Sequence, residues 1–218
     1  MTVPVVIRID ARVHANERPG IREAATQLRD CLAGASSEGS FRVELAFSEP
    51  AGPPVLAPAS TLLVLSLLPE ADRGAEPLAE TARRWMGELR AFADAGTPVY
   101  VRNIFRHVRD RARNGRTHPV LDRIRNLDRM AVGLSSQTGV AVIDIDRAFA
   151  DVGARALRTD YRLEGARAAF LSGHTTVLSF LSCGMDELVD PDVQERARVL
   201  HGGLRDAHAL IQQRFTGD

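Results

Sequence analysis

Residues 139–184 read GVAVIDIDRAFADVGARALRTDYRLEGARAAFLSGHTTVLSFLSCG. The segment opens with an unbroken apolar run, 140–143, which predicts a strand buried on both faces. A short helical piece follows, then a polar loop with Asp160, then an apolar helix that contains His174. In doubly wound α/β proteins, ligands bind in the loops that follow the strands. We therefore expect this segment to form one wall of a site.

The preceding sequence alternates strand patterns with helix patterns. Strands are predicted at 3–9, 41–47, 61–68 and 98–102, and helices at 21–33, 77–95 and 119–136. The run 61–68 is continuously apolar, which is typical of a central parallel strand. Long helices between strands require parallel pairing with right-handed crossovers. The predicted fold class is α/β: a three-layer α/β/α domain with a five-stranded parallel sheet, flavodoxin-like in the broad sense.

The last thirty residues carry a separate amphipathic pattern. We predict one α/β domain over 1–188 and a C-terminal helix over 189–218 that starts at Asp190-Pro191. Its apolar residues recur at 4-3-4-3-4 spacing and are Val193, Ala197, Leu200, Leu204, Ala207 and Ile211. This stripe packs either on the chain's own body or on a second copy in a homodimer.

The composition excludes several kinds of chemistry. All 28 basic residues are arginine and the formal net charge is zero. Without lysine there is no Schiff-base chemistry and no P-loop or protein-kinase site. Two cysteines cannot form a four-cysteine zinc site. The pair Asp144 and Asp146 resembles a DxD metal motif, but we interpret Asp146 as the cap of a helix beginning at Arg147. We expect no cofactor and no metal site.

Cellular location and partners are predicted from what the sequence lacks. The N-terminal MTVPVVIRID has no basic region of a secretion signal, and the apolar run 61–68 is too short to span a membrane. We expect a cytoplasmic protein that does not bind membranes. Zero net charge and few aromatic residues near the arginines argue against nucleic acid.

The order of these elements over 3–184 resembles that of the SGNH (GDSL-type) hydrolases. The residue pattern resembles that family in particular in the segment VAVIDIDRAFADVGARALRTDYRLEGARAA. That resemblance implies a Ser after the first strand, oxyanion-hole residues after the second and third, and a DxxH pair before the last helix. A triad of this kind needs a hydroxyl beside an imidazole that a carboxylate orients.

The sequence departs from the family at those positions. The first strand ends Arg8-Ile9-Asp10-Ala11-Arg12 without Gly-Asp-Ser, and the third continues as Leu67-Leu68-Pro69-Glu70 without an Asn motif. In the segment 160–163, DYRL, a leucine holds the position of the histidine. The usual Ser and His of the triad are therefore absent.

Polar side chains near the predicted strand ends supply the candidate site. Asp10, Asp160 and His174 are the candidate acid–base residues. The candidate substrate-binding residues are Arg12, His14, Asn103, Arg106 and His107. Nine arginines against three aspartates lie between 102 and 129, and arginine suits phosphate and carboxylate groups.

Two functions follow from these residues. The first is a divergent SGNH-like enzyme, a hydrolase or acyltransferase, that acts on a small acylated or anionic metabolite. The alternative is a non-catalytic relative that binds a ligand or an acidic partner protein through the arginine-rich loop. These two functions differ in what Asp10 and Asp160 do, because only the enzyme needs their carboxylates for proton transfer.

Overall fold

The computed structural model describes residues 4–36, 41–48, 61–109 and 118–215. The strands are β1 (Val5–Arg12), β2 (Phe41–Phe47), β3 (Thr61–Ser66), β4 (Val99–Arg102) and β5 (Ala141–Ile143). All pairings are parallel and the strand order is β2-β1-β3-β4-β5. This is the order of flavodoxin-like doubly wound folds, so the predicted five-stranded parallel sheet is confirmed.

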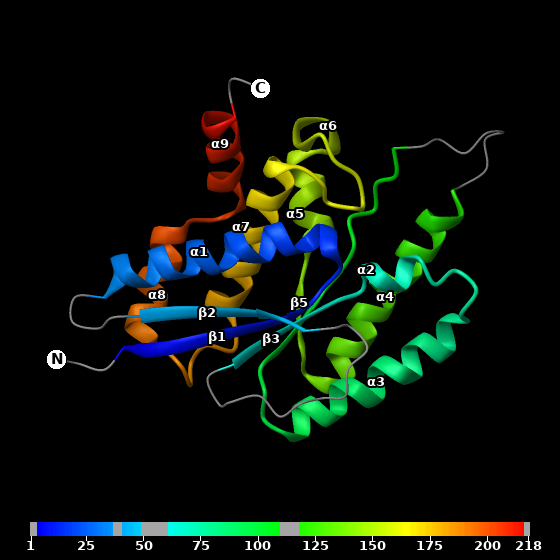
Figure 1. Cartoon of the computed structure of the whole chain (residues 1–218), viewed down its shortest axis with the longest axis horizontal. Coiled ribbons are helices and arrows are strands. Elements are labelled where there is room, and N and C mark those ends of the chain that lie inside the picture. The colour runs from blue at the N-terminus through cyan, green and yellow to red at the C-terminus, as the bar shows by residue number, and fades with distance from the viewer. Residues whose placement is uncertain (1–3, 37–40, 49–60, 110–117, 216–218) are drawn as a thin grey trace.

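The helices form a layer on each face of the sheet (Figure 1). One layer contains α1 (Arg18–Ala35) and α7 (Ala166–Ser182), and the other contains α3 (Leu78–Asp94) and α4 (Pro119–Thr138). Shorter helical segments in the connections are η1 (Ala15–Glu17), α2 (Leu68–Ala71), α5 (Ile145–Val152) and α6 (Ala154–Leu157). None of the helices within the described ranges is both long and apolar enough to span a membrane.

The alternation of side chains along β1 divides the core in two. Ile7, Ile9 and Ala11 point into the cluster under α1 and α7, whereas Arg12 points toward α3. All residues of β3 are buried, as the continuous apolar run predicted. β3 stops at Ser66, two residues before the end of the predicted run 61–68. Pro69 lies in the first turn of α2, where a backbone N–H would have no partner within the helix.

The predicted single C-terminal helix is two helices, α8 (Pro191–His201) and α9 (Leu204–Arg214). Gly202, with φ of 76°, breaks the backbone between them. Because α9 turns away from the axis of α8, the continuous stripe of apolar residues divides: Ala197, Ala207 and Ile211 are buried, whereas Leu200 is exposed. Arg196 of α8 donates to the Ala35 carbonyl of α1 at 2.9 Å, so α8 packs on the end of α1.

Candidate functional site

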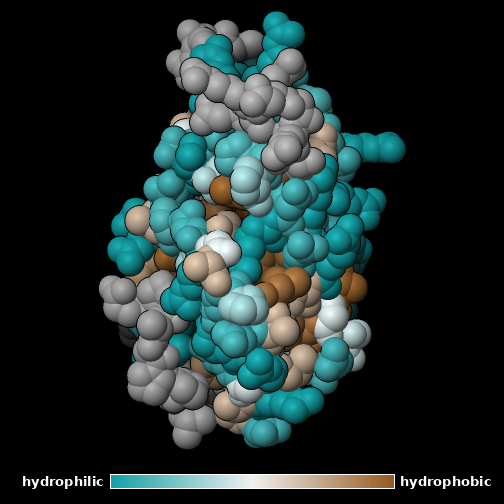
Figure 2. All heavy atoms as spheres, turned by 90° about the vertical axis from the view of Figure 1, so that its right-hand side faces the viewer, coloured by the Kyte–Doolittle hydropathy of each residue, from teal (hydrophilic) through white to brown (hydrophobic). Residues whose placement is uncertain are grey.

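The carboxyl ends of the parallel strands meet on one side of the molecule, on the right of Figure 1. We call this side the carboxyl edge. Figure 2 shows it face on, and most of its surface is hydrophilic. The loops after β1, β4 and β5 and the loop before α7 (158–165) supply its polar side chains, and the contacts between these loops define the site.

Asn103, the first residue after β4, connects the ends of β4 and β5. Its amide nitrogen donates to Asp144 Oδ1 at 2.8 Å, and its amide oxygen accepts from the Asp146 backbone N–H at 3.0 Å. Asp144 also accepts from Arg147 N and caps α5, which begins at Ile145. The expectation that Asp146 caps a helix beginning at Arg147 is therefore wrong, because Asp144 occupies that position and leaves Asp146 available for other contacts.

Those contacts are with Arg106. The Arg106 backbone N–H donates to Asp146 Oδ1 at 2.8 Å, and its guanidinium Nε donates to Oδ2 at 2.7 Å. This carboxylate raises the pKa of Arg106. The Arg106 side chain is 55% exposed while that of Asp146 is 9% exposed, so the pair presents a positive group to solvent over a buried negative one.

Beneath Arg106 lies Asp128 of α4, a residue that we did not predict as part of the site. Its Oδ1 accepts from Ile104 N at 2.9 Å, and its Oδ2 lies 3.9 Å from Arg106 Nε. Oδ2 is buried and accepts no hydrogen bond from the described residues. Burial, reinforced by the nearby charge of Asp146, raises the pKa of Asp128 to about 7.

A signal for Asp128 is present in the sequence. The buried face of α4 comprises Ile124, Leu127, Ala131 and Leu134, and Asp128 lies four residues after Ile124 and three before Ala131. A carboxylate at that spacing is placed against the core, where a charge is costly unless it has partners. An acidic residue in the apolar stripe of a helix thus indicates a carboxyl group that is held against the core.

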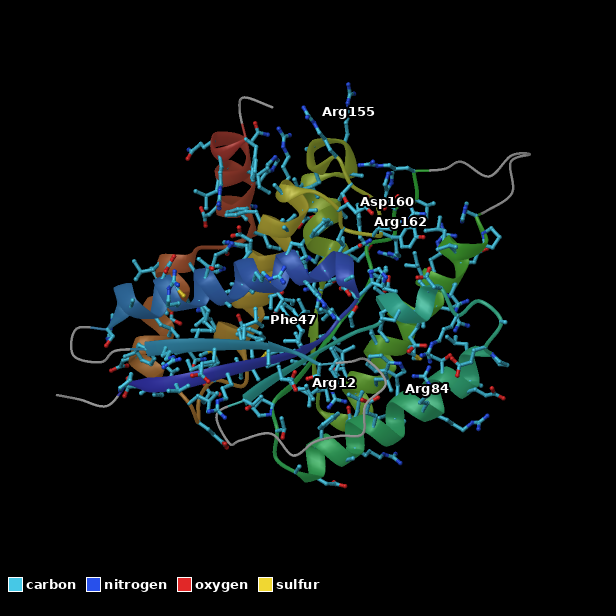
Figure 3. The ribbon with its side chains drawn as sticks, in the orientation of Figure 1. Arg12, Phe47, Arg84, Arg155, Asp160 and Arg162 are labelled. Atoms are coloured by element: carbon cyan, nitrogen blue, oxygen red, sulfur yellow. The ribbon has the colours of Figure 1, made fainter. Side chains whose placement is uncertain are left out.

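The loop before α7 joins this cluster through His107. The His107 carbonyl accepts from Tyr161 N at 2.8 Å, and its ring stacks on Phe105 with centroids 5.7 Å apart. Asp160 is buried and accepts from Arg162 twice, from the backbone N–H at 3.0 Å and from the guanidinium at 3.3 Å. Figure 3 shows Asp160 and Arg162 together above the strand ends.

The loop after β1 reaches the same area through Asn16, whose amide donates to Glu164 at 3.4 Å. His14 caps η1, because its Nδ1 accepts from Asn16 N at 3.3 Å. His14 N in turn donates to Glu17 at 3.0 Å. Of the predicted residues, the structure therefore brings His14, Asn103, Arg106, His107 and Asp160 to the carboxyl edge.

Asp10 and Arg12 do not join them. Both side chains leave β1 on the face that α3 covers, where Arg12 pairs with Glu88 at 3.4 Å and lies over the Phe92 ring. Asp10 lies within the strand and accepts from Ser48 Oγ at 2.5 Å. Figure 3 shows Arg12 on the α3 side, well separated from Asp160. Successive side chains of a strand point to opposite faces of the sheet, and this alternation directs Asp10 and Arg12 away from the loops. The prediction did not take it into account.

His174 is also separate from Asp160. It lies in the interior of α7 with its Nε2 3.2 Å from the Gly203 carbonyl, and its ring stacks on His201 at 3.9 Å. Burial lowers the pKa of His174 to about 4. Its contacts are with α8 and α9, so the structure does not form the predicted group of Asp10, Asp160 and His174. Leu163, at the position of the family's histidine, is buried in the core.

A buried ion pair, absent from the predictions, supports the carboxyl edge from below. Arg102, the last residue of β4, is fully buried and lies 3.3 Å from the Glu17 carboxylate, which is also buried. Arg102 also donates to Ser172 Oγ of α7 at 2.7 Å. The three residues connect the β1 loop, β4 and α7. In the sequence, the only sign of this ion pair is an arginine at the end of a buried strand.

Within the described residues, neither of the two buried serines is paired with an imidazole. Ser172 accepts from Arg102, and Ser66 Oγ accepts from Leu68 N at 3.0 Å. Within the described ranges no group of three or more His, Cys, Asp or Glu side chains could hold a metal ion. Residues 110–117, which carry Arg111, Arg113 and Arg116 of the arginine-rich loop, lie outside the described residues.

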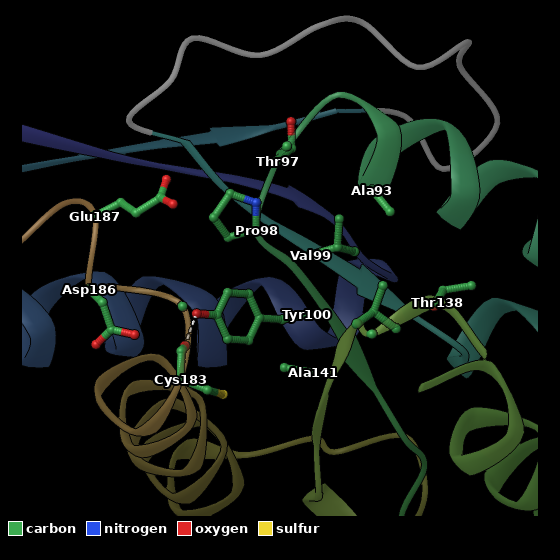
Figure 4. Close-up of a pocket in the computed structure, with 14 residues that line it drawn as sticks. Ala93, Thr97, Pro98, Val99, Tyr100, Thr138, Ala141, Cys183, Asp186 and Glu187 are labelled. Atoms are coloured by element: carbon green, nitrogen blue, oxygen red, sulfur yellow. Dashed lines mark hydrogen bonds between the residues drawn. The ribbon is translucent and has the colours of Figure 1, made fainter. Parts of the chain in front are cut away.

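A pocket of about 400 Å³ lies at the opposite, amino edge of the sheet (Figure 4). There the Tyr100 hydroxyl donates to the Cys183 carbonyl. Gly184, with φ of 86°, permits this approach, because a Cβ at that position would lie 2.5 Å from the hydroxyl. The pocket contains none of the predicted site residues.

Comparisons with known proteins give similarity to solved structures, but not to family models or curated proteins. A solved structure from Slackia heliotrinireducens, described as a candidate SGNH hydrolase, is 14% identical with a TM-score of 0.48. The alignment covers 82% of this chain and 100% of the other.

Proposed function

We propose that the protein is an enzyme with an SGNH-like arrangement that acts on a small anionic or acylated metabolite at the carboxyl edge. The observation that carries this proposal is Asp128, a carboxyl group with a pKa near 7 and one buried oxygen that accepts no hydrogen bond from the described residues. A group that exchanges its proton near neutral pH suits general acid–base catalysis. The resemblance to hydrolases supplies the class of reaction, ester hydrolysis or acyl transfer.

Arg106 supplies the means of binding the substrate. Its exposed guanidinium already neutralises Asp146 and lies 3.9 Å from Asp128, so an anionic group that binds Arg106 alters the charge beside Asp128. Arg106 lowers the pKa of Asp128, and engaging it with a substrate anion raises that pKa. Substrate binding and protonation of Asp128 are thus coupled, which favours proton uptake once the substrate is bound.

The reaction then needs no serine. The Asp128 carboxylate takes a proton from a water molecule, whose oxygen attacks the acyl carbon. The bond to the leaving group breaks as the leaving oxygen takes that proton back from Asp128. In acyl transfer an acceptor hydroxyl replaces the water. Asn103 binds the Asp144 carboxylate and the Asp146 backbone N–H, and so keeps the ends of β4 and β5 together.

The test combines a panel of short-chain p-nitrophenyl esters with a fluorophosphonate probe. We expect ester turnover without covalent labelling, and at least a hundredfold lower kcat/KM in Asp128→Asn. Asp122→Asn, an exposed change in the same helix, is the matched control and keeps full activity. Covalent labelling of a serine together with turnover contradicts the proposal, and so does full activity of Asp128→Asn.

A second function rests on the arginines that surround this edge. Arg109 donates to the Arg158 carbonyl, which places it beside the segment that carries Arg155 and Arg162. Figure 3 shows Arg155 and Arg162 on the same upper side of the molecule as Asp160. Such a grouping suits an acidic partner protein, with an affinity that falls as salt rises.

A polyglutamate peptide labelled for fluorescence anisotropy tests this alternative. Binding at 50 mM salt that is lost at 300 mM, and is weakened at least fivefold in the double variant Arg109→Ala and Arg155→Ala, supports it. The matched control replaces Arg29 and Arg42, which lie on other exposed surfaces. Equal weakening in the control, or no binding by the unmodified protein, counts against it.

A further inference from the structure

Two arginines at the carboxyl edge are anchored in the same way. Arg106 Nε donates to Asp146 Oδ2 at 2.7 Å, and Arg162 Nη1 donates to Asp160 Oδ2 at 3.3 Å. The arginine side chains are 55% and 47% exposed, whereas those of Asp146 and Asp160 are 9% and 8% exposed. Each pair therefore buries its carboxylate and presents a guanidinium group to solvent.

The segments that carry these arginines run antiparallel beside each other. Tyr161 N donates to the His107 carbonyl at 2.8 Å, and the Arg109 guanidinium donates to the Arg158 carbonyl. Residue numbers therefore rise along one segment as they fall along the other, which places the backbones of the two arginines opposite each other. In Figure 1 the yellow loop before α7 lies beside the green segment after β4 at this point.

Both guanidinium groups are held in place and still have donors for a ligand. A guanidinium has more N–H donors than a single carboxylate accepts, so each arginine retains N–H groups beyond those that its aspartate engages. The Arg162 guanidinium also lies over the Tyr161 ring, with its Cζ 4.9 Å from the ring centroid, and this contact limits its rotation. Two such groups on adjacent segments suit an anion with several acceptor oxygens.

Two exposed acids near these arginines, Asp144 and Glu164, have partners of their own. Asp144 accepts from Asn103 at 2.8 Å, and Glu164 accepts from Asn16 at 3.4 Å. The ion pairs of the two arginines are with other carboxylates. An anion that binds the arginines therefore breaks no ion pair of these two acids.

We propose that Arg106 and Arg162 form a clamp for a phosphate group, so that the anionic metabolite of the proposed function carries a phosphate monoester. This inference rests on the proposed function for the location of the site, but not on any catalytic step. Near neutral pH a phosphate monoester carries about two negative charges and offers about three acceptor oxygens, which two guanidinium groups match. A carboxylate has a single charge, and one guanidinium fork satisfies it. Arg162 is thus a residue that determines specificity.

Isothermal titration calorimetry of the full chain at pH 7.5 and low salt tests the clamp. The probes are phenyl phosphate, phenyl sulfate and benzoate, which share the ring and differ in the anionic group. Phenyl sulfate keeps the terminal oxygens of the phosphate but has only one charge. We expect the Kd of phenyl phosphate to be about tenfold lower than that of the other two probes, because only the dianion neutralises both arginines.

Variants then assign the binding to the clamp. Arg162→Gln should raise the Kd of phenyl phosphate by about tenfold or more, because it removes one of the two guanidinium groups. Arg162→Lys keeps the charge beside Asp160 and should recover only part of the affinity, since an ammonium group lacks the planar fork. Arg198→Gln is the matched control, because Arg198 is 46% exposed and pairs with Glu195 on α8. Circular dichroism confirms that the variants are folded, and Arg162→Lys decides the question if Arg162→Gln is not.

The clamp is overturned if the unmodified protein does not bind phenyl phosphate, or binds phenyl sulfate equally well. An unchanged Kd in Arg162→Gln, or an equal loss of affinity in Arg198→Gln, also overturns it. The titration involves no turnover, so the clamp and the proposed function fail separately. Ester turnover without phosphate binding removes the clamp alone, and phosphate binding without ester turnover removes the proposed chemistry alone.

Discussion

Replacing Asp128 with asparagine is expected to change how stability depends on pH. Folding raises the pKa of this carboxyl from 3.8 to about 7, chiefly through burial. Because the native pKa exceeds the unfolded one, the stability contributed by this group is fully present below pH 3.8 and is lost as the pH rises toward 7. Asparagine keeps an acceptor for Ile104 N and carries no charge, so it resembles the protonated form.

The magnitude follows from that pKa difference. About three pH units at 1.36 kcal/mol each correspond to ~4 kcal/mol, which is an upper limit because water entry and movement of the half-exposed Arg106 relieve the buried charge. We expect the free energy of unfolding of Asp128→Asn, relative to the unmodified protein, to increase by about 2–4 kcal/mol between pH 4 and pH 8.5.

Urea denaturation at four pH values, followed by circular dichroism, measures this difference. Asp122→Asn serves as the control, because its side chain is 56% exposed and pairs with Arg125 only at the surface. The control curve should run parallel to that of the unmodified protein within about 0.5 kcal/mol. Parallel curves for Asp128→Asn as well, or a loss of stability at pH 8.5, would refute the reasoning that Asp128 is a buried carboxyl group held near neutrality.

Two further predictions concern a buried ion pair and the packing of two glycines. Glu70→Ala leaves the Arg84 guanidinium without its buried carboxylate partner. Because the Arg84 side chain is 38% exposed, we expect urea denaturation to show a loss of only about 2–3 kcal/mol in the free energy of unfolding. An unchanged denaturation midpoint would contradict this expectation. Gly20→Ala places a Cβ 2.3 Å from Ser172 Oγ between α1 and α7, so we expect it to lower the stability by about 1–3 kcal/mol. Gly87→Ala lies in open space on α3 and should raise the stability by about 0.5–1 kcal/mol. Stability changes of the same sign in both variants would contradict the packing argument.

Much of the fold could be predicted because its signals are local. Continuous apolar runs such as 61–68, of which 61–66 form β3, identified buried strands, and the 3.6-residue period of α3 and α4 identified the helices that cover them. Parallel pairing followed from the alternation of strands and helices. The C-terminal region was less predictable, since the 4-3-4 stripe favoured one helix and the Gly202-Gly203 pair separated it into α8 and α9.

The positions of the candidate residues could be predicted where they directly follow a strand end. Asn103, Arg106 and His107 come immediately after β4, and Asp160 precedes α7, so chain position alone placed them at the carboxyl edge. Asp10 was misplaced because it lies two residues inside β1, where the alternation of side chains sends it to the α3 face. His174 was misplaced because helical distance from Asp160 does not indicate which neighbouring helix its ring contacts.

The sequence by itself determined the layers and the parallel sheet, because hydrophobic periodicity is a property of the chain alone. Only the tertiary structure decided which carboxylates are buried together. In the sequence nothing distinguishes Asp128 from the other helical aspartates, because its burial results from the packing of α4 beside the β4 loop. Likewise, Arg102 differs from the other 27 of the 28 arginines only through its contacts with Glu17 and Ser172. Desolvation and pairing depend on contacts between distant segments, and those contacts set the pKa of a carboxyl group and therefore the chemistry that it can perform.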